Sequence, residues 1–327
     1  MKISGIVAAL VVGVSLHAAP LRAQQEIIFA IDSDKDTLQQ LTQEEFAKRA
    51  NERLAGKAIV KTFHSAQLGK DKDLLQKLKL GSVHLSMPSS IMSSVLDLYG
   101  VWDMPFLIKD RAHVTRFGEK VFWPKIAPAT EAKGYKVLGL WENGVRNITN
   151  NVRPINKPAD LAGLKIRIPG GVWRKKMFEA WGANPTPLAF SEVFVALQTN
   201  VVDGQENPNT NIYAGKFYEV QKYLSITRHV YTPSYLIAGK ETFAKLDPAV
   251  QKVLVDLGRE MESWARAKGE ADDAVIEDKL VAGGMKRNVA DYQAFVDASK
   301  PIYEQFAKEV PGGGDLISAA LALSKGN

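Results

Sequence analysis

The chain has 327 residues, of which 46% are apolar and 24% charged, with a formal net charge of +6 and no cysteine. Its length suggests roughly two domains of about 150 residues each, and its composition is that of an ordinary globular protein. The lack of cysteine excludes disulfide bonds and thiol chemistry. Because the basic surplus forms no concentrated tail, we expect no nucleic-acid partner.

The N-terminal segment differs from the rest of the chain. Lys2 gives it a positive start, residues 6–14 are apolar, and small residues at Ala18, Ala19 and Ala23 resemble a cleavage site. This order is typical of a secretory signal peptide, and the apolar stretch is shorter than the ~20 residues that span a membrane. We therefore predict cleavage near Ala23 and a periplasmic location. An uncleaved anchor is the alternative.

Strand and helix patterns alternate in the first half of the remaining chain. Apolar runs predict strands at 26–31, 57–63, 82–87 and 135–144, the last running into a polar loop. Helices are expected at 42–56, with Thr42 as the N-cap and Gly56 as the stop, and at 71–81. This alternation favours an α/β fold with mostly parallel sheets.

The second half contains one unusually long helical pattern. It follows a predicted strand at 164–168 and a short helix at 191–200 that Ser191 would cap. From Pro248 the apolar spacing continues to Leu280, and an unbroken helix of that length would extend ~50 Å, enough to bridge two lobes. The alternative is two helices that break near Lys268-Gly269.

One arginine lies at the end of a strand-like run. Leu164, Ile166 and Ile168 alternate with Lys165 and Arg167, so Arg167 points away from the apolar face. Burying an arginine there is costly unless an anion meets it. Ligands of open α/β sheets bind beyond the carboxyl ends of the strands.

A Pro-Gly-Gly turn follows Arg167 and opens a helix. The free N–H groups of that helix carry partial positive charge, and a guanidinium can hold a carboxylate through two parallel hydrogen bonds. Arg167 and residues 169–171 therefore predict a carboxylate site. A structural ion pair between Arg167 and an Asp or Glu of the protein explains the residue equally well at this point.

Two motifs identify a family. "GLKIRIPGG" (163–171) and "PTPLAFSEVFVALQTNVVDGQENP" (185–208) follow "FHSAQLG", "WDMPFL" and "ENGVRNIT" in an order that resembles the DctP-like solute-binding proteins of TRAP transporters. The resemblance implies a two-lobed periplasmic-binding-protein-like clamp of α/β fold, with a long helix spanning both lobes. The lobes expected are 24–144 plus 233–272, and 145–232 plus 273–327.

The resemblance also implies roles for individual residues. Arg167 would form a salt bridge with a ligand carboxylate, and Asn207 would hydrogen-bond the same group. The Phe190 ring would pack on the ligand, and Arg146, which matches the arginine after the family's Asn-Gly pair, would be a further ligand residue. Where the family usually has glycine, this chain has Asn200. Asparagine also adopts the left-handed conformation that ends a helix, so we expect the cap to persist.

Further candidates rest on position and residue type. The amides of Gln205, Asn207 and Asn209 follow an Asp-Gly turn and could bind an oxyanion, or could bond only backbone. Trp173 could line the cleft, or pack in the core with Met177 and Trp181 at helical spacing. The remaining expectations are Asp32, Ser65, Ser89 and Trp102 as first-lobe ligand residues; Arg174, Lys175 and Lys176 as a solvated face; and His64, His84, His113 and His229 as ordinary polar positions without metal-ligand spacing.

No catalytic or cofactor motif is present. The sequence has no G-x-S-x-G, H-E-x-x-H, P-loop or G-x-G-x-x-G, so we expect no enzyme activity, cofactor or metal. The expected partners are a small organic acid anion and the small and large membrane subunits of a TRAP transporter, with the receptor a monomer. The alternatives are a receptor for an ATP-driven importer and an exported enzyme acting on an organic acid.

Overall fold

A computed structural model describes residues 24–325, so the predicted signal peptide lies outside the described residues. The strands are β1 (Gln25–Ala30), β2 (Ala58–Phe63), β3 (Leu85–Ser86), β4 (Tyr135–Asn150), β5 (Lys165–Ile168), β6 (Asn184–Pro187), β7 (Gly204–Pro208), β8 (Tyr223–Ile226), β9 (Tyr231–Gly239) and β10 (Lys286–Val289). The α-helices are α1 (Leu38–Leu54), α2 (Asp71–Leu80), α3 (Arg111–Phe117), α4 (Ala127–Glu131), α5 (Val172–Ala180), α6 (Val193–Gln198), α7 (Asn209–Ala214), α8 (Lys240–Phe243), α9 (Pro248–Ala282), α10 (Tyr292–Ala298), α11 (Lys300–Glu309) and α12 (Gly313–Leu323). Short 3-10 turns include η1 (Ser90–Ser94), η2 (Asp97–Asp103) and η5 (Phe190–Glu192), and η3 (Gly118–Ile126) is π-helical.

The sheet is mixed: five of the nine strand pairings among the described residues are parallel, as expected, and the antiparallel ones involve β4 and β9. Its order is β2-β1-β3-β9-β4-β7-β5-β6, with β8 joined to β4 and β10 to β8. The flanking pairs β1–β2, β1–β3, β5–β6 and β5–β7 are parallel, but β4 and β9 at the centre run antiparallel to their neighbours. These two strands cross between the halves, and the sequence pattern does not reveal their direction.

β4 carries the chain from one half to the other. It pairs with β9 as far as Val145 and with β7 from Arg146 onward. The predicted polar loop after residue 144 is therefore wrong, because the strand continues to Asn150. Its polar side chains, such as Asn147, are buried and find hydrogen-bond partners inside the molecule, which is why a polar run can remain a strand.

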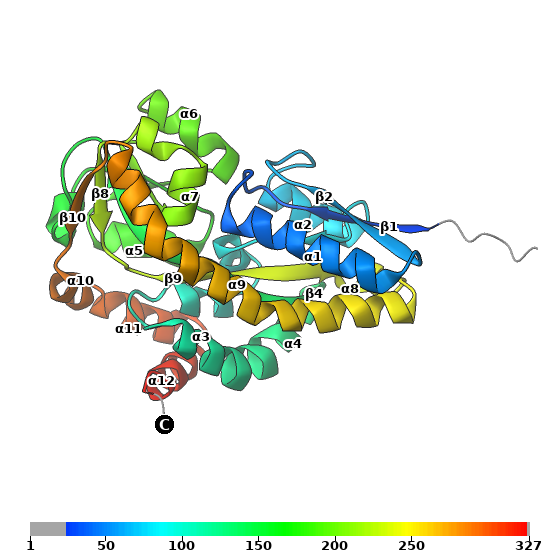
Figure 1. The fold of residues 1–327 in the computed structure, drawn as a ribbon. Coiled ribbons are helices and arrows are strands. Elements are labelled where there is room, and N and C mark those ends of the chain that lie inside the picture. Colours follow the sequence, from blue (N-terminus) through cyan, green and yellow to red (C-terminus); the bar gives the residue numbers. More distant parts are fainter. Residues whose placement is uncertain (1–23, 326–327) are drawn as a thin grey trace, which may run out of the picture.

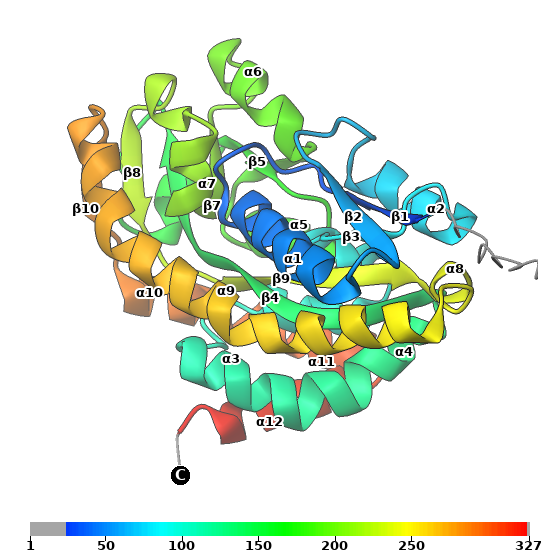
Figure 2. The ribbon, with the colours of Figure 1, turned by 45° about the vertical axis from the view of Figure 1, so that its right-hand side comes forward.

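α9 runs along the length of the molecule beneath both halves, as Figures 1 and 2 show. It is unbroken over 35 residues, which confirms the long helix and excludes the break near Lys268-Gly269. Gly269 has a packing role instead, because a Cβ there would lie 2.3 Å from Oε1 of Glu142. The helix packs against α1 and β4 on one side and α7 further along.

The C-terminal helices contact both predicted lobe ranges. α12 packs on α3 and η2, and α11 packs on α5. Of the described residues, no helix combines the length and apolar character that crossing a bilayer requires.

Several helix ends differ from the sequence pattern. Thr37 caps α1, whereas Thr42 lies inside it and donates to the carbonyl of Leu38. The short helix begins as the turn η5, so Ser191 is not its N-cap. Asn200 has φ 57°, the left-handed conformation expected of a cap. A threonine near the start of an apolar helical pattern predicts that a helix begins nearby, but the pattern does not show whether Thr37 or Thr42 is the N-cap.

Candidate ligand-binding site

A cavity of about 260 Å³ lies between the two halves of the molecule. Its volume is just below the ~300–1,000 Å³ of pockets for drug-sized ligands, so it suits a small solute. Its charged and amide-bearing wall residues are Asp32, Gln39, Lys70, Asp71, Lys72, Asn143, Arg146, Arg167, Glu192, Asn207 and Asn211. The rest of the wall is Ser33, Ser89, Ser90, Ile91, Pro169, Gly170, Pro187, Leu188, Ala189 and Phe190.

Arg167 and Arg146 are buried cations of this wall, and Arg167 is the one without a carboxylate partner among the described residues. The flanking Ile166 and Ile168 are fully buried in the core, and Arg167 itself is 2% exposed on the opposite face of β5. Its Nε and Nη2 donate to the carbonyl of Leu188 at 3.0 and 2.6 Å. Within residues 24–325 it has no carboxylate within ion-pair distance, so the alternative of a structural ion pair is not observed. Burial, and then the charge of Arg146, lower its pKa to about 10, which leaves it charged at neutral pH.

The turn after Arg167 adjoins the same cavity. Pro169 and Gly170 line it, and Gly171 precedes α5 with φ 142°. A Cβ at Gly171 would lie 2.7 Å from Oγ of Ser93, so glycine is needed for both its backbone conformation and its close approach.

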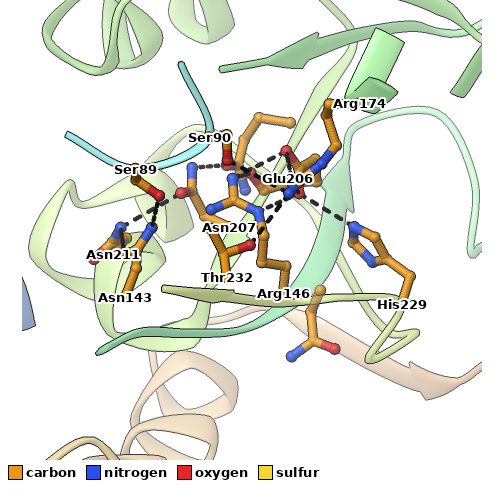
Figure 3. A network of polar contacts seen from close by, with 12 residues as sticks. Ser89, Ser90, Asn143, Arg146, Arg174, Glu206, Asn207, Asn211, His229 and Thr232 are labelled. Carbon is orange, nitrogen blue, oxygen red and sulfur yellow. Dashed lines mark hydrogen bonds and ion pairs between the residues drawn. The ribbon is translucent and has the colours of Figure 1, made fainter. Parts of the chain in front are cut away.

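A buried network of charges adjoins the cavity and shares Arg146 with its wall (Figure 3). Arg174 donates through Nη1 to both carboxylate oxygens of Glu206, at 2.9 and 2.8 Å, and through Nη2 to Oδ1 of Asp103 at 2.7 Å. Arg146 also binds the Glu206 carboxylate, with Nη2–Oε1 at 3.0 Å. These two guanidiniums are thus balanced by two carboxylates of the protein.

Arg174 corrects a sequence expectation, because it is fully buried and not part of a solvated face. Arg174 shares a buried face with Phe178, four residues later, but this spacing alone does not show that an arginine there has carboxylate partners. An arginine on a buried helix face can point inward when buried carboxylates, here those of Asp103 and Glu206, form ion pairs with it.

Ionisation states in the network follow from burial and charge. Burial alone would raise the pKa of Glu206, but Arg146 and Arg174 more than offset this and hold it well below its usual range. Burial lowers the pKa of His229 to about 4, so its ring is neutral at pH 7. Since a carboxylate only accepts, His229 donates through Nε2 to Glu206 at 3.1 Å, and its Nδ1 accepts from the hydroxyl of Thr227.

Amide side chains form a third part of the wall. Asn207 on β7 is 2% exposed, and its Nδ2 donates to Oε1 of Gln205 at 2.6 Å. Asn211 donates to Oδ1 of Asn143 at 3.0 Å, and Asn143 donates to Oγ of Ser89 at 3.2 Å. These amides bond one another and not only backbone. Gln205 lies behind the wall and orients Asn207.

Contacts also join the two walls across the cavity. Oδ2 of Asp32, at the end of β1, accepts from the backbone N–H of Phe190 at 3.2 Å. Lys70, just before α2, binds Glu192 at 2.7 Å. Burial raises the pKa of Asp32 and, more strongly, that of Asp71. Direct protein contacts thus join the two walls of the cavity.

The structure brings six of the predicted ligand residues into the cavity wall. These are Arg167, Arg146, Asn207, Phe190, Ser89 and Asp32.

Four predicted residues lie outside the wall. Trp173 packs edge-on against Phe306 at 4.8 Å, and Trp102 packs against Phe117 at 5.0 Å, so both belong to the core, as aromatics at helical spacing usually do. Gln205 is fully buried behind Asn207. Ser65 lies in a turn with φ 50°, and its Oγ forms a hydrogen bond with Nδ1 of His64.

Some wall residues of the first lobe range, including Lys70 and Asp71, were not predicted from the sequence. Lys70 and Asp71 open α2 directly after a glycine, and an acidic residue in a helix's first turn is a common and therefore unspecific pattern. Among residues 24–325, no three His, Asp or Glu side chains are grouped to hold a metal ion.

Comparisons with known proteins give a consistent result. The family model described as bacterial extracellular solute-binding protein, family 7 (DctP) matches residues 29–309. The 2,3-diketo-L-gulonate-binding periplasmic protein of Escherichia coli is 32% identical over 323 residues, which cover 98% of both chains. The sugar acid binding protein DctPAm of Advenella mimigardefordensis, solved with galactonate, is 30% identical with a TM-score of 0.88, over 92% of this chain and 99% of that one.

A third relative carries a different ligand. The TRAP periplasmic solute binding protein of Sulfurospirillum deleyianum, solved with succinate, is 31% identical with a TM-score of 0.87, over 92% of this chain and 100% of that one. These relatives are two-lobed solute receptors and not enzymes, which confirms both the resemblance and the fold class expected from the motifs. The chain therefore belongs to the DctP family of solute-binding proteins of TRAP transporters.

Proposed function

We propose that this protein captures a small carboxylate-bearing solute between its two lobes and delivers it to the membrane subunits of a TRAP transporter. The observation that carries the proposal is Arg167, a buried guanidinium that faces a cavity and has no protein carboxylate within ion-pair distance among the described residues. Removing such a charge from water is costly unless an anion compensates it. A ligand carboxylate is the missing partner.

The groups around Arg167 fit that partner. A guanidinium matches a carboxylate with two parallel hydrogen bonds, and the pair is strengthened where water is excluded. Asn207 lines the cavity with an amide that can add a hydrogen bond, and Phe190 offers an apolar ring. Arg146 also lines the cavity and adds positive potential, although Glu206 already balances its charge.

Capture would proceed by closure of the lobes. We assign residues 24–144 with 233–272 to one lobe and 145–232 with 273–327 to the other, with β4, β9 and α9 crossing between them. The contacts Asp32–Phe190 and Lys70–Glu192 join these two ranges in the closed form. A ligand favours closure only through contacts with both lobes, and the wall residues come from both.

The cellular setting follows from the family. We propose export to the periplasm with cleavage near Ala23, function as a monomer, and recognition of the loaded form by one small and one large membrane subunit. The relatives named above are periplasmic proteins of this kind. Uptake that requires this receptor together with those subunits, and no ATPase, would test the delivery step.

The carboxylate assignment is tested with Arg167→Ala. A thermal-shift panel of organic acids identifies a binding acid, and calorimetry then compares affinities. We expect a loss of ~3–5 kcal/mol, or two to three and a half orders of magnitude. Lys165→Ala is the matched control, because Lys165 is on the same strand but exposed. Affinity of Arg167→Ala within about threefold of wild type, with the fold intact, would refute the assignment.

A further inference from the structure

The three segments that cross between the lobe ranges, β4, β9 and α9, are joined by one network of side chains. Glu142 lies on β4 and is fully buried, and both of its carboxylate oxygens accept from Nε of Arg111 at 3.0 Å. The hydroxyl of Tyr231, on β9, donates to Oε2 of Glu142 at 3.1 Å. Nη2 of Arg111 donates to Oδ2 of Asp273, on α9, at 2.6 Å. We call these four residues the crossing network.

Each crossing segment also has a weakened backbone beside this network. The pairing of β4 with β9 shifts between Glu142 and Gly144, and Gly144 has φ 128°. Such a bulge bends a strand, and this backbone conformation favours glycine. The residue opposite Glu142 on β9 is Pro233, which has no N–H to donate to the ladder. On α9, Gly269 approaches the Glu142 carboxylate closely, and glycine stabilises a helix less than any residue but proline.

A second cavity, of about 480 Å³, adjoins the crossing network. Arg111, Tyr231 and Asp273 all line it, and its wall also includes Asn147 and Arg228 from the other lobe range. Because closely packed interiors resist movement, open space beside the crossing segments allows the angle between the lobes to change without displacing packed side chains.

We propose that Arg111 is a positioning residue for ligand capture: through Glu142 and Asp273 it ties the crossing segments together where each of them can bend, so that the lobes close about a single axis. This inference rests on the capture by closure proposed above. Hinge motions are absorbed by a few residues of the connecting segments. Three segments that were not joined could bend independently, and the two walls of the ligand cavity would then meet in many relative positions.

The crossing network acts on the ligand only through the arrangement of the lobes. The wall of the ligand cavity, as far as the described residues form it, includes none of its four members. The charge-assisted bonds of Arg111 to two carboxylates make the tie firm. Only molecules whose lobes meet correctly can hold the ligand, and the apparent affinity falls in proportion to the fraction of molecules in that arrangement.

The spread of inter-lobe distances tests the proposal directly. Because the chain has no cysteine, two introduced cysteines would carry the only spin labels. Leu80, at the end of α2, and Val195, on α6, lie in different lobe ranges and are 81% and 59% exposed, so both suit replacement by cysteine. Pulsed electron paramagnetic resonance then compares Arg111→Ala with the unaltered network. We expect a broader distance distribution in the variant, both ligand-free and with a saturating acid.

Calorimetry measures the effect on capture. The probe is whichever of galactonate, succinate and 2,3-diketo-L-gulonate, the acids named for the relatives, binds wild type most tightly. Arg111→Ala should weaken its binding by about tenfold, as expected if one molecule in ten keeps the competent arrangement. An unchanged width of the distribution, or an unchanged affinity, in the folded variant would overturn the inference. If none of these acids binds wild type, the width of the ligand-free distribution decides.

A second variant guards against misfolding. Asp273→Ala leaves the Arg111–Glu142 pair in place and removes only the partly exposed bond to α9. It should broaden the distribution and weaken binding less than Arg111→Ala does, and it decides the matter if Arg111→Ala does not fold. Arg53→Ala is the matched control, because it removes an ion pair to Glu260 on the same helix but within one lobe range, and it should change neither quantity.

The same measurements separate this inference from the proposed function. If the probe acid binds wild type without changing the inter-lobe distance, capture by closure fails and the inference fails with it. If wild type closes on binding and both network variants close with the same width and affinity, the inference alone is overturned.

Discussion

The cavity wall and the layer beneath it contain buried arginines with different partners. Arg174, in the layer beneath, and Arg146, in the wall itself, are balanced by Glu206 and Asp103. Arg167 is as buried as Arg146, at 2% exposure, yet meets only the carbonyl of Leu188. Arg146 and Arg167 are the same residue type and equally buried, so they differ only in whether a protein carboxylate pairs with the guanidinium. A charge that the protein balances contributes to structure, and one that it leaves unbalanced is available to a ligand.

The largest expected effect is on folding, from the lower layer. Arg174→Ala should reduce the free energy of unfolding by ~3–5 kcal/mol, because Asp103 and Glu206 would lose a buried partner. Arg167→Ala should reduce it far less, since Arg167 forms no ion pair with a carboxylate of the described residues. Urea denaturation of both variants makes the comparison, with Lys175→Ala as an exposed control on the same helix. Equal free energies of unfolding for the two variants would contradict the distinction between a structural Arg174 and a ligand-binding Arg167.

The second effect is a loss of folding stability at acid pH, caused by the buried His229 of the same layer. The pKa of His229 is about 4 in the fold and about 6.5 when unfolded, so between these values only the unfolded chain takes up the proton. Stability should therefore fall as the pH drops from 7 to 4.5, by about 2–3 kcal/mol from this group. Glu142, whose pKa burial raises to about 7, acts in the opposite sense over the same range.

The His229 contribution is isolated by difference. The change in unfolding free energy between pH 7 and pH 4.5 is measured by urea denaturation for wild type and for His229→Gln, so that the contribution of Glu142 cancels. We expect the variant to lose less stability on acidification. If both proteins lose the same amount, His229 is not buried neutral as the structure indicates.

The third effect is on ligand affinity, and it distinguishes Asn207, which we expect to contact the ligand, from Asn209, which we expect to support the structure. Asn207→Ala should weaken binding of the identified acid by ~1.5–3 kcal/mol, the range for one hydrogen bond to a charged group. Asn209→Ala should instead affect stability, because Asn209 lies outside the wall and accepts from Asn147. Calorimetry and denaturation on both variants test this. Reduced stability with unchanged affinity in Asn207→Ala would assign it a structural role.

The smallest expected effect is at the exposed contact across the cavity. Lys70→Ala removes the ion pair with Glu192, whose side chains are 47% and 44% exposed. Exposed pairs contribute little and are screened by salt, so affinity should change by less than about fivefold, and less still at high ionic strength. A larger loss that persists in salt would show that this pair, and not the ligand, dominates closure.

Patterns with a local cause could be predicted from the sequence. The alternation in β5 places Arg167 opposite Ile166 and Ile168 because side chains of a strand point to alternate faces. The apolar spacing from Pro248 predicts α9 because helix periodicity needs no distant partner. The left-handed cap at Asn200 follows from residue type. The family motifs then added Arg146, Asn207 and Phe190 to the wall residues, whereas Asp32 and Ser89 were expected from position only.

Features that depend on distant partners were not predictable. Arg174 is buried because Asp103 and Glu206, 71 and 32 residues away, meet it, and helix spacing cannot indicate that. The polar run of β4 remains a strand because its amides pair inside the molecule, and Trp173 belongs to the core because Phe306, more than a hundred residues later, lies beside it. Side-chain periodicity determines which face a residue takes, whereas the charge and shape that meet that face come from segments brought together only by folding.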